Sequence, residues 1–307
     1  MFNGVMRMAF RGPFRLVLLI GAFLSKLYEL QSRLCVLRHR LRKTGFENPL
    51  MDKARVAGAI AFIARKPTLW LKQIGPERRS VRLQDLRVVK TISASCRRRR
   101  LTLLEKLLHE LSPPIRLLDV GGTQEFWETV EFCHRPGIEI VLLNTWAIQP
   151  RYENFRSVIG DARNMSQFRD QEFDVVFSNS AIEHVGSFED QHRVANEMIR
   201  VGKRLFVQTP NRHFAIEPHF LFPCFQFLPV AVRVWLASRF DLGRWSTSER
   251  SDPAFRVDSV RLLSKRELRE LFPRAEIVCE RLAGLPKSFL VLENWQAPGI
   301  KPNEIAF

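Results

Sequence analysis

Short apolar runs separated by polar turns recur along the chain from about residue 100 onward. Each run has the length of a buried strand, roughly four to eight residues, and turn-forming residues follow several of them. We expect strands at residues 115–120, 138–143, 175–177, 205–209, 276–281 and 288–293, and the end of a further strand at 158–159. The first run is apolar enough for an interior parallel strand, so the pattern predicts an α/β domain.

A stripe of leucines precedes the first of these strands. It falls on one face of a helix, which Pro113 and Pro114 end, and the members are Leu101, Leu103, Leu104, Leu107, Leu108 and Leu111. This helix is expected to pack on the sheet. Four arginines at residues 97–100 begin it, and they have two interpretations: a solvated helix start, or a site for phosphate or anionic lipid.

A second apolar stretch, residues 221–236, follows the fifth strand. Pro223, Pro229 and Arg233 interrupt it, so it predicts a helical cap over a pocket rather than a membrane span. Such a cap suits an apolar or aromatic ligand. The alternative is that the stretch simply packs against the sheet.

Candidate binding residues stand where the first strand ends. Asp119 closes the apolar run, and Gly121 and Gly122 allow backbone torsions and a close ligand approach that a side chain would prevent. The three-glycine spacing of a dinucleotide-binding fingerprint is missing, which disfavours a nicotinamide oxidoreductase. The turn is therefore the expected binding edge of the sheet.

The order Asp119-x-Gly121-Gly122 resembles motif I of class I S-adenosylmethionine-dependent methyltransferases. That motif usually has an acidic residue followed by glycines at alternate positions. In this chain Thr123 and Glu125 stand at the second and third of those positions, so the match is partial.

Later stretches resemble the remaining motifs of that family in the correct order. The second strand ends at Asn144, where the family usually has an acidic residue for the ribose hydroxyls; an amide can bond a diol but lacks the charge. Asp161 stands where a carboxylate accepts from the adenine amino group. Residues 173–185 resemble the fourth-strand motif, and the last two runs resemble the closing antiparallel pair. The resemblance covers about residues 100–295, and it looks most like the branch called methyltransferase type 11 or type 23.

The resemblance implies a doubly wound, mostly parallel, seven-stranded Rossmann-like sheet with a basic, helical N-terminal appendage. It also implies S-adenosylmethionine as cofactor and methyl transfer to an unidentified small-molecule, lipid or glycan acceptor. The residues then expected at the cofactor are Asp119, Gly121, Gly122, Thr123, Asn144, Asp161, Ala162 and Asn179. Phe126 and Trp127 would be core residues of the following helix.

His184 is the candidate catalytic residue. With Glu183 it follows the fourth strand, where the implied substrate pocket opens, and an imidazole can accept a proton from a hydroxyl nucleophile. A structural role is the alternative. His213, Glu217 and His219 follow the fifth strand and could ring the acceptor site. We expect no metal there, because no cysteine or carboxylate cluster accompanies them.

The positive charge of the chain is concentrated ahead of the sheet. Residues 1–115 hold 24 Lys or Arg and 7 Asp or Glu, a net charge of +17, whereas residues 116–307 hold 24 and 25, a net charge of −1. We therefore expect the basic segment to contact an anionic membrane surface, with nucleic acid as the less favoured partner. Methylation of base amino groups is disfavoured, because residues 178–181 lack the Asn/Asp-Pro-Pro-aromatic motif of such enzymes.

These patterns divide the chain into four parts. They are a basic, partly apolar arm at 1–50, a basic helical segment at 51–96, the methyltransferase domain at 97–295 with a helical cap at about 213–250, and a tail at 296–307. Met51 offers a second start, so the arm is either disordered or outside the folded protein. Five widely spaced cysteines without a C-x-x-C pair indicate reduced thiols, and we expect a cytoplasmic protein, peripheral to the inner face of the membrane.

A different class of function fits the departures at Thr123, Glu125 and Asn144. A non-catalytic protein with the methyltransferase fold needs none of the missing groups, and its basic arm would be the working part, on a membrane or on nucleic acid. Binding of the cofactor separates the two classes.

Overall fold

The computed structural model describes residues 87–128, 130, 136–240, 242–243, 245, 251–282 and 284–295. The expected arm, most of the basic helical segment and the tail lie outside these residues, as do Cys35 and Cys133. Among the helices that the structure describes, none combines the length and the apolar character needed to cross a bilayer.

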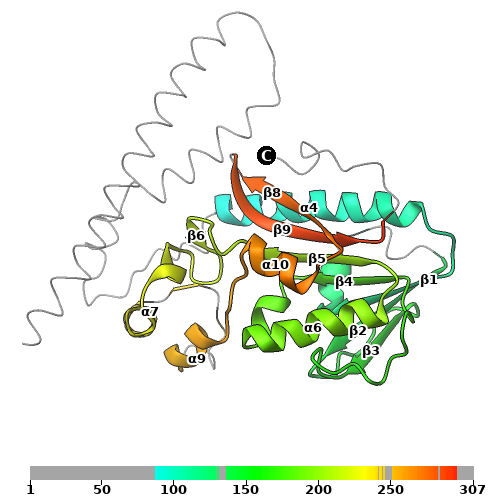
Figure 1. Ribbon diagram of the computed structural model, residues 1–307, viewed down its shortest axis with the longest axis horizontal. Coiled ribbons are helices and arrows are strands. Elements are labelled where there is room, and N and C mark those ends of the chain that lie inside the picture. Colours follow the sequence, from blue (N-terminus) through cyan, green and yellow to red (C-terminus); the bar gives the residue numbers. More distant parts are fainter. Residues whose placement is uncertain are drawn as a thin grey trace, which may run out of the picture.

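A single seven-stranded sheet forms the centre of the molecule (Figure 1). Its spatial order is β3-β2-β1-β4-β5-β9-β8. The first five strands are parallel, and β9 runs antiparallel to both β5 and β8. The bounds are β1 Ile115–Val120, β2 Ile138–Asn144, β3 Phe155–Ile159, β4 Val175–Asn179, β5 Leu205–Pro210, β8 Glu276–Leu282 and β9 Leu285–Glu293. The prediction of a mostly parallel seven-stranded sheet is confirmed.

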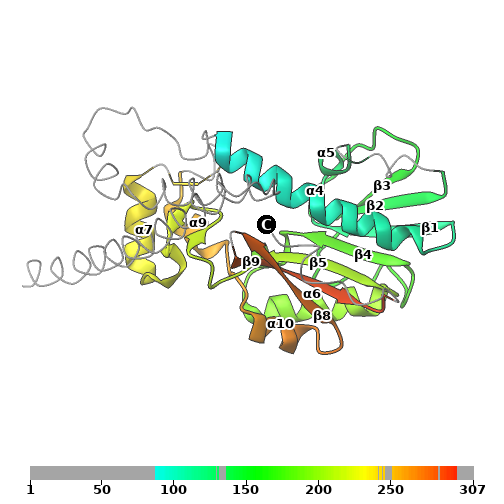
Figure 2. The same cartoon turned by 90° about the horizontal axis from the view of Figure 1, so that it is seen from above.

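Helices cover both faces of the sheet. The leucines of α4 (Arg87–His109) pack on one face, together with Trp127 of the short helix α5 (Gln124–Trp127). On the other face α6 (Phe188–Val201) and α10 (Lys265–Leu271) pack against the alternate residues of the same strands. Figure 2 shows α4 and α6 on opposite sides of the sheet. Strands buried on both faces explain why the runs are apolar without alternation.

The leucine face predicted for α4 is confirmed, but its start differs from the expectation. The helix begins at Arg87, so the expected domain boundary at residue 97 falls inside it. Three members of the arginine run are exposed, whereas Arg100 is 8% exposed. Arg100 donates to the side chains of Asn179 and Gln208, at the ends of β4 and β5, and its Nε lies 3.3 Å from Glu280 Oε1. It is therefore neither a solvated helix start nor an open lipid site.

A smaller unit lies beyond one end of the sheet in both views (Figures 1 and 2). It has its own apolar cluster, which includes Phe220, Phe225 and Leu236. Its elements are β6 Ile216–Glu217, β7 Phe222–Pro223, η4 Phe225–Phe227, α7 Val230–Arg239 and α9 Pro253–Asp258. The prediction of a helical cap over residues 221–236 is wrong in its first half, because helix α7 begins only after Pro229, where proline is suited to a helix start.

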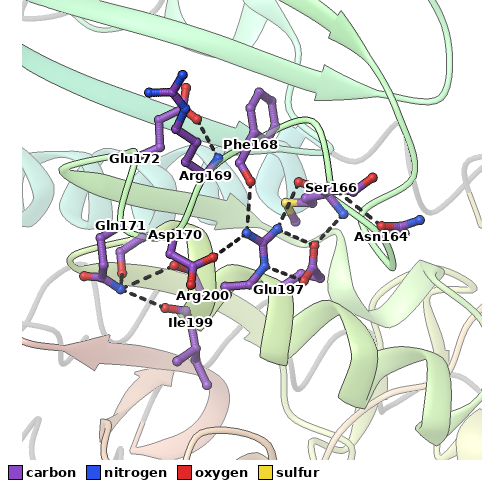
Figure 3. Close-up of polar contacts among 12 residues, drawn as sticks. Asn164, Ser166, Phe168, Arg169, Asp170, Gln171, Glu172, Glu197, Ile199 and Arg200 are labelled. Atoms are coloured by element: carbon purple, nitrogen blue, oxygen red, sulfur yellow. Dashed lines mark hydrogen bonds and ion pairs between the residues drawn. The ribbon is translucent and has the colours of Figure 1, made fainter.

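Arg200 fixes the connection between β3 and β4 (Figure 3). Its guanidinium donates to Glu197 and to Asp170, each at 2.8 Å, and to the carbonyl oxygens of Phe168 and Met165. These bonds join the connection to helix α6.

Candidate functional site

The carboxyl ends of four neighbouring parallel strands meet at one edge of the sheet. The backbone N–H of Gly121 donates to Leu143 O at 2.9 Å, and the N–H of Gly160 donates to Asn144 O at 2.9 Å. The loops after β1, β2 and β3 therefore start side by side. Open α/β sheets bind ligands at this edge.

The turn after β1 leaves no room for side chains. Gly121 is exposed, has φ +78°, and a Cβ built on it would lie 2.7 Å from the Cβ of Ala181, in the loop after β4. A Cβ on Gly122 would lie 1.6 Å from Asp119 Oδ2. The sequence needs both glycines here for space, and Gly121 also for its left-handed backbone. The narrow space between the turn and Ala181 is named the Gly121 cradle.

Asp119 lies beneath the turn rather than in it. Its side chain is fully buried, and Oδ2 accepts a hydrogen bond of 2.6 Å from Trp127 Nε1. Oδ1 has no hydrogen-bond partner in the part of the chain that the structure describes. Burial raises the pKa of the Asp119 carboxyl to about 7, and the bond from Trp127 offsets only part of that rise. Trp127 is a fully buried core residue and Phe126 packs on the same cluster, which confirms that part of the prediction.

Asn144 also faces the protein. Its Nδ2 donates to Gly122 O at 2.5 Å, so the amide holds the turn in place. Thr123 precedes helix α5 and makes no side-chain cap bond. Ala162 packs against the cluster beneath α6. These residues shape the edge: the side chain of Asn144 bonds inward, whereas that of Thr123 bonds the exposed carboxylate of Glu125.

Asp161 is the carboxylate that reaches the surface at this edge. Its side chain is 45% exposed and accepts from Arg163 Nη2 at 2.6 Å. The hydrogen bonds from Arg163 lower the pKa of Asp161, so the carboxylate is ionised at neutral pH. The carboxylate at this position is thus held in an exposed ion pair. Asn179 is half-buried and accepts from Arg100.

Two histidines and a glutamate come together after β4. Glu183 and His184 belong to η3 (Ile182–His184), and His219 follows β6. One ligand atom from each of the three lies within 4.8 Å of the others. The two imidazole rings meet edge to face, with centroids 4.8 Å apart. These three residues are named the His–Glu cluster.

Hydrogen bonds orient both imidazoles of the His–Glu cluster. The Nδ1 of His219 donates to Glu217 Oε1 at 2.8 Å, and the Nδ1 of His184 donates to the carbonyl oxygen of Ser259 at 3.2 Å. Desolvation lowers the pKa of His184. Burial also lowers the pKa of His219, but the bond to Glu217 and the charges of Glu217 and Glu183 outweigh it, so that pKa is raised.

The strands of this edge lie within a segment that matches a known protein family. Residues 137–205, from the residue before β2 to the first residue of β5, match the family model described as "Methyltransferase domain". The match spans β2, β3 and β4, and the strand order with its antiparallel closing pair agrees with it. The domain has the class I methyltransferase fold.

Solved structures similar to this methyltransferase domain have low sequence identity. A putative O-methyltransferase from Nostoc punctiforme PCC 73102 is 12% identical over 67% of this chain, with a TM-score of 0.40; the match spans only 58% of that protein. A SAM-dependent methyltransferase from Methanosarcina mazei is 14% identical over 61% of this chain and 95% of its own, with a TM-score of 0.37. A possible exported protein from Bordetella parapertussis is 10% identical. The match covers 83% of this chain and 92% of that protein, with a TM-score of 0.42. No curated protein matches the sequence. These similarities carry no argument about the activity of the chain.

A cavity of about 490 Å³ lies between the methyltransferase domain and its cap. Arg212, Arg233 and Arg261 line it together with Glu217, and Phe220 and Phe225 form part of its apolar wall. Arg261 is bound to Gln191 and Glu267, each at 2.6 Å. Arg233 Nε is buried without a hydrogen-bond partner among the described residues. Protein partners thus hold Arg261, whereas Arg233 has one nitrogen, Nε, that is unpaired among the described residues.

The sequence patterns single out every member of the His–Glu cluster but do not predict that the three residues lie close together. Glu183 and His184 were recognised as a pair after the fourth strand, and His219 as part of a separate polar stretch. In the folded chain the cap brings His219 against His184 of η3. These residues are 35 positions apart, so no local sequence pattern predicts the contact. His213 stays outside the cluster, where its ring stacks on Phe227 at 6.1 Å.

Proposed function

We propose that the chain transfers the methyl group of S-adenosylmethionine to an acidic small molecule, lipid or glycan intermediate. The observation that carries the proposal is the Gly121 cradle, a strip of exposed backbone at the carboxyl edge of a methyltransferase domain. A Cβ at residue 121 would lie 2.7 Å from the Cβ of Ala181, so glycine lets the turn pack against the loop after β4 and leaves the exposed backbone there without a side chain of its own.

Some of the residues at the edge fit the carboxylate end and the adenine base of S-adenosylmethionine. Backbone N–H groups of residues 122 and 123 would bind its carboxylate, since that of Gly121 already donates to Leu143 O, and the exposed carboxylate of Asp161 would accept from the adenine amino group. Asp119 and Asn144 would act through the turn, since both side chains bond inside the protein. When bound, the cofactor supplies a methyl group that is already activated on sulfur.

The protein's own part is alignment and exclusion of water. The cap and the loop after β4 surround the cavity beside the His–Glu cluster, and Glu217 lines the cavity while it accepts from His219 of the cluster. His184 is the candidate proton acceptor, because its Nδ1 is held by Ser259 O and its Nε2 lone pair remains.

The arginines of the cavity define the acceptor class. Three guanidinium groups beside two phenylalanine rings suit a molecule with a phosphate or carboxylate next to an apolar part. With S-adenosylhomocysteine present, calorimetric titration should detect binding of acidic acceptors and not of their neutral analogues, and Arg233→Ala should weaken it. Equal binding of both kinds would remove the acidic group from the proposal.

A second candidate function rests on the inward bonds of Asp119 and Asn144. A non-catalytic protein with this fold could use both groups to hold its turn, and its basic arm would then bind membrane or nucleic acid. Isothermal titration with S-adenosylmethionine separates the two functions. Micromolar binding supports the enzyme, and absence of binding at millimolar ligand supports the non-catalytic protein.

The same titration tests the site. Asp161→Ala should weaken binding by about 1 kcal/mol, the value of one partly exposed hydrogen bond. Glu189→Ala is the matched control, because Glu189 is also an exposed carboxylate paired with an arginine, 3.8 Å from Arg193 Nε, and it lies outside the Arg200 network. Equal affinities of the two variants would take Asp161 out of the site.

A further inference from the structure

Each member of the His–Glu cluster is held by a partner outside the cluster. Glu217 accepts from His219 Nδ1, Ser259 O accepts from His184 Nδ1, and Glu183 Oε2 accepts from Thr209 Oγ1 at 3.0 Å. A histidine that binds a metal through one nitrogen almost always donates from the other to a carboxylate or a carbonyl. Both imidazoles show that arrangement, with the Nε2 atom left over.

The remaining oxygen of Glu183 has no hydrogen bond. Glu183 is 0% exposed, and its Oε1 has no hydrogen-bond partner among the residues that the structure describes. A buried carboxylate oxygen that stays unpaired is costly, because burial removes its water without replacement. His219 Nε2 lies 3.9 Å from this oxygen, beyond hydrogen-bond distance. The oxygen therefore points to a ligand that the described residues do not supply.

We infer that Glu183, His184 and His219 form a binding site for one divalent transition-metal cation of the Zn²⁺ class. Two imidazole nitrogens and one carboxylate oxygen are a ligand set that zinc accepts, and three protein ligands leave a position open for a further oxygen. Around a tetrahedral zinc ion, ligand atoms lie about 3.3 Å apart. Compared with the present upper limit of 4.8 Å, the ligand atoms must approach by at most about 1.5 Å.

The site adds to the proposed function and does not depend on it. A cation at His184 Nε2 takes the lone pair that proton acceptance would use, so the cation, and not the imidazole, would then activate an acceptor oxygen. Glu217, which holds His219 through Nδ1, also lines the cavity, so the cluster and the cavity share this residue as a neighbour. Metal binding is measurable without cofactor or acceptor, so its failure is distinguishable from failure of methyl transfer.

The experiment is titration of metal-free full-length protein with Zn²⁺ by calorimetry, and with Co²⁺ by visible absorption. We expect one site, with the d–d bands of nitrogen- and oxygen-bound Co²⁺. Glu183→Gln and His219→Ala should each abolish it. Glu217→Gln should weaken binding about 10- to 100-fold, as removal of an outer partner of a ligating histidine does.

The control is His213→Ala, which removes a neighbouring histidine of the same polar stretch outside the cluster. It should keep full affinity, and circular dichroism should show that every variant is folded. Wild-type affinity in folded Glu183→Gln, or no binding by the wild-type protein at micromolar Zn²⁺, would overturn the site. The second result would leave the His219–Glu183 ion pair as the function of these groups.

Discussion

At the scale of single residues, the edge of the sheet depends on groups that never reach the surface. Asp119 is the main example, because its carboxylate supports the turn from below and is fully buried. A carboxyl with a folded pKa of about 7 binds its proton more tightly in the folded state than in the unfolded chain. Its contribution to stability is therefore complete below the unfolded pKa of 3.8 and is lost as pH rises through 7.

Asp119→Asn should remove this pH dependence. Between pH 5 and pH 8 the wild-type protein should lose between about 2 and 3 kcal/mol of unfolding free energy more than the variant, which keeps an acceptor for Trp127 but cannot ionise. Urea unfolding at both pH values measures the difference. Parallel pH profiles of the two proteins would show that the carboxyl stays ionised in the fold.

The Gly121 cradle gives a second prediction about one residue. Gly121→Ala and Gly284→Ala both place a side chain on a left-handed backbone, with φ +78° and +84°, at a cost of about 1–2 kcal/mol each. The new Cβ at residue 121 meets Ala181, whereas none of the described atoms lies within 4 Å of the one at residue 284. Gly121→Ala should therefore cost about 1–3 kcal/mol more in thermal unfolding and should alone lower cofactor affinity. Equal stability and affinity of the two variants would show that the cradle can widen.

At the scale of elements, the connection between β3 and β4 is the clearest case of local order created by one side chain. Arg200 lies on α6 and binds two carboxylates and two carbonyl groups of that connection and its own helix (Figure 3). The carboxylates raise the pKa of its guanidinium, so the charge is present at every working pH.

Arg200→Ala should lower the unfolding free energy by about 2 kcal/mol and should loosen the connection after Asp161. Amide hydrogen exchange of residues 164–172 measures the loosening. Arg193→Ala on the same helix is the control, since its carboxylate contacts are 3.8 Å long and its side chain is 59% exposed, so it should change stability by less than about 0.5 kcal/mol. Unchanged exchange in Arg200→Ala would assign the order of the connection to its backbone.

The strands could be predicted from the sequence because each one is a continuous apolar run with a turn at its end, as in 138–143 and 205–209. The cap could not, because its short strands and η4 carry few residues each and owe their shape to the separate cluster around Phe220 and Phe225. Likewise the edge residues Asp119, Asn144 and Asp161 could be placed on neighbouring strand ends. Their directions, inward for two and outward for one, depend on Trp127, Gly122 and Arg163, which strand periodicity does not describe.

At the scale of the whole molecule, the excess of basic residues and the candidate site residues lie in different parts of the chain. Residues 1–50 hold nine Lys or Arg and two Glu, a net charge of +7, and the sheet and cap residues are close to neutral. We therefore expect the arm to determine association with anionic surfaces, and the edge and cavity to determine ligand binding.

Deleting residues 1–50 should reduce binding to vesicles that contain phosphatidylserine by at least about tenfold, because each basic side chain near such a surface contributes about 1 kcal/mol. The affinity for S-adenosylmethionine should stay the same. Vesicle sedimentation at two salt concentrations measures the first effect, with neutral vesicles as control. Equal sedimentation of the full and shortened chains would place the membrane contact elsewhere, and loss of folding would show that these residues belong to the core.

Arg100 has a practical consequence for cutting the protein. Its helix lies outside the matched residues 137–205, yet its cation satisfies acceptors 79 and 108 positions away. An expression clone that starts at Ile115 would leave the buried Glu280 without that cation and the leucine-covered face bare to solvent. Any shortened version made for crystallisation should therefore begin upstream of Arg87.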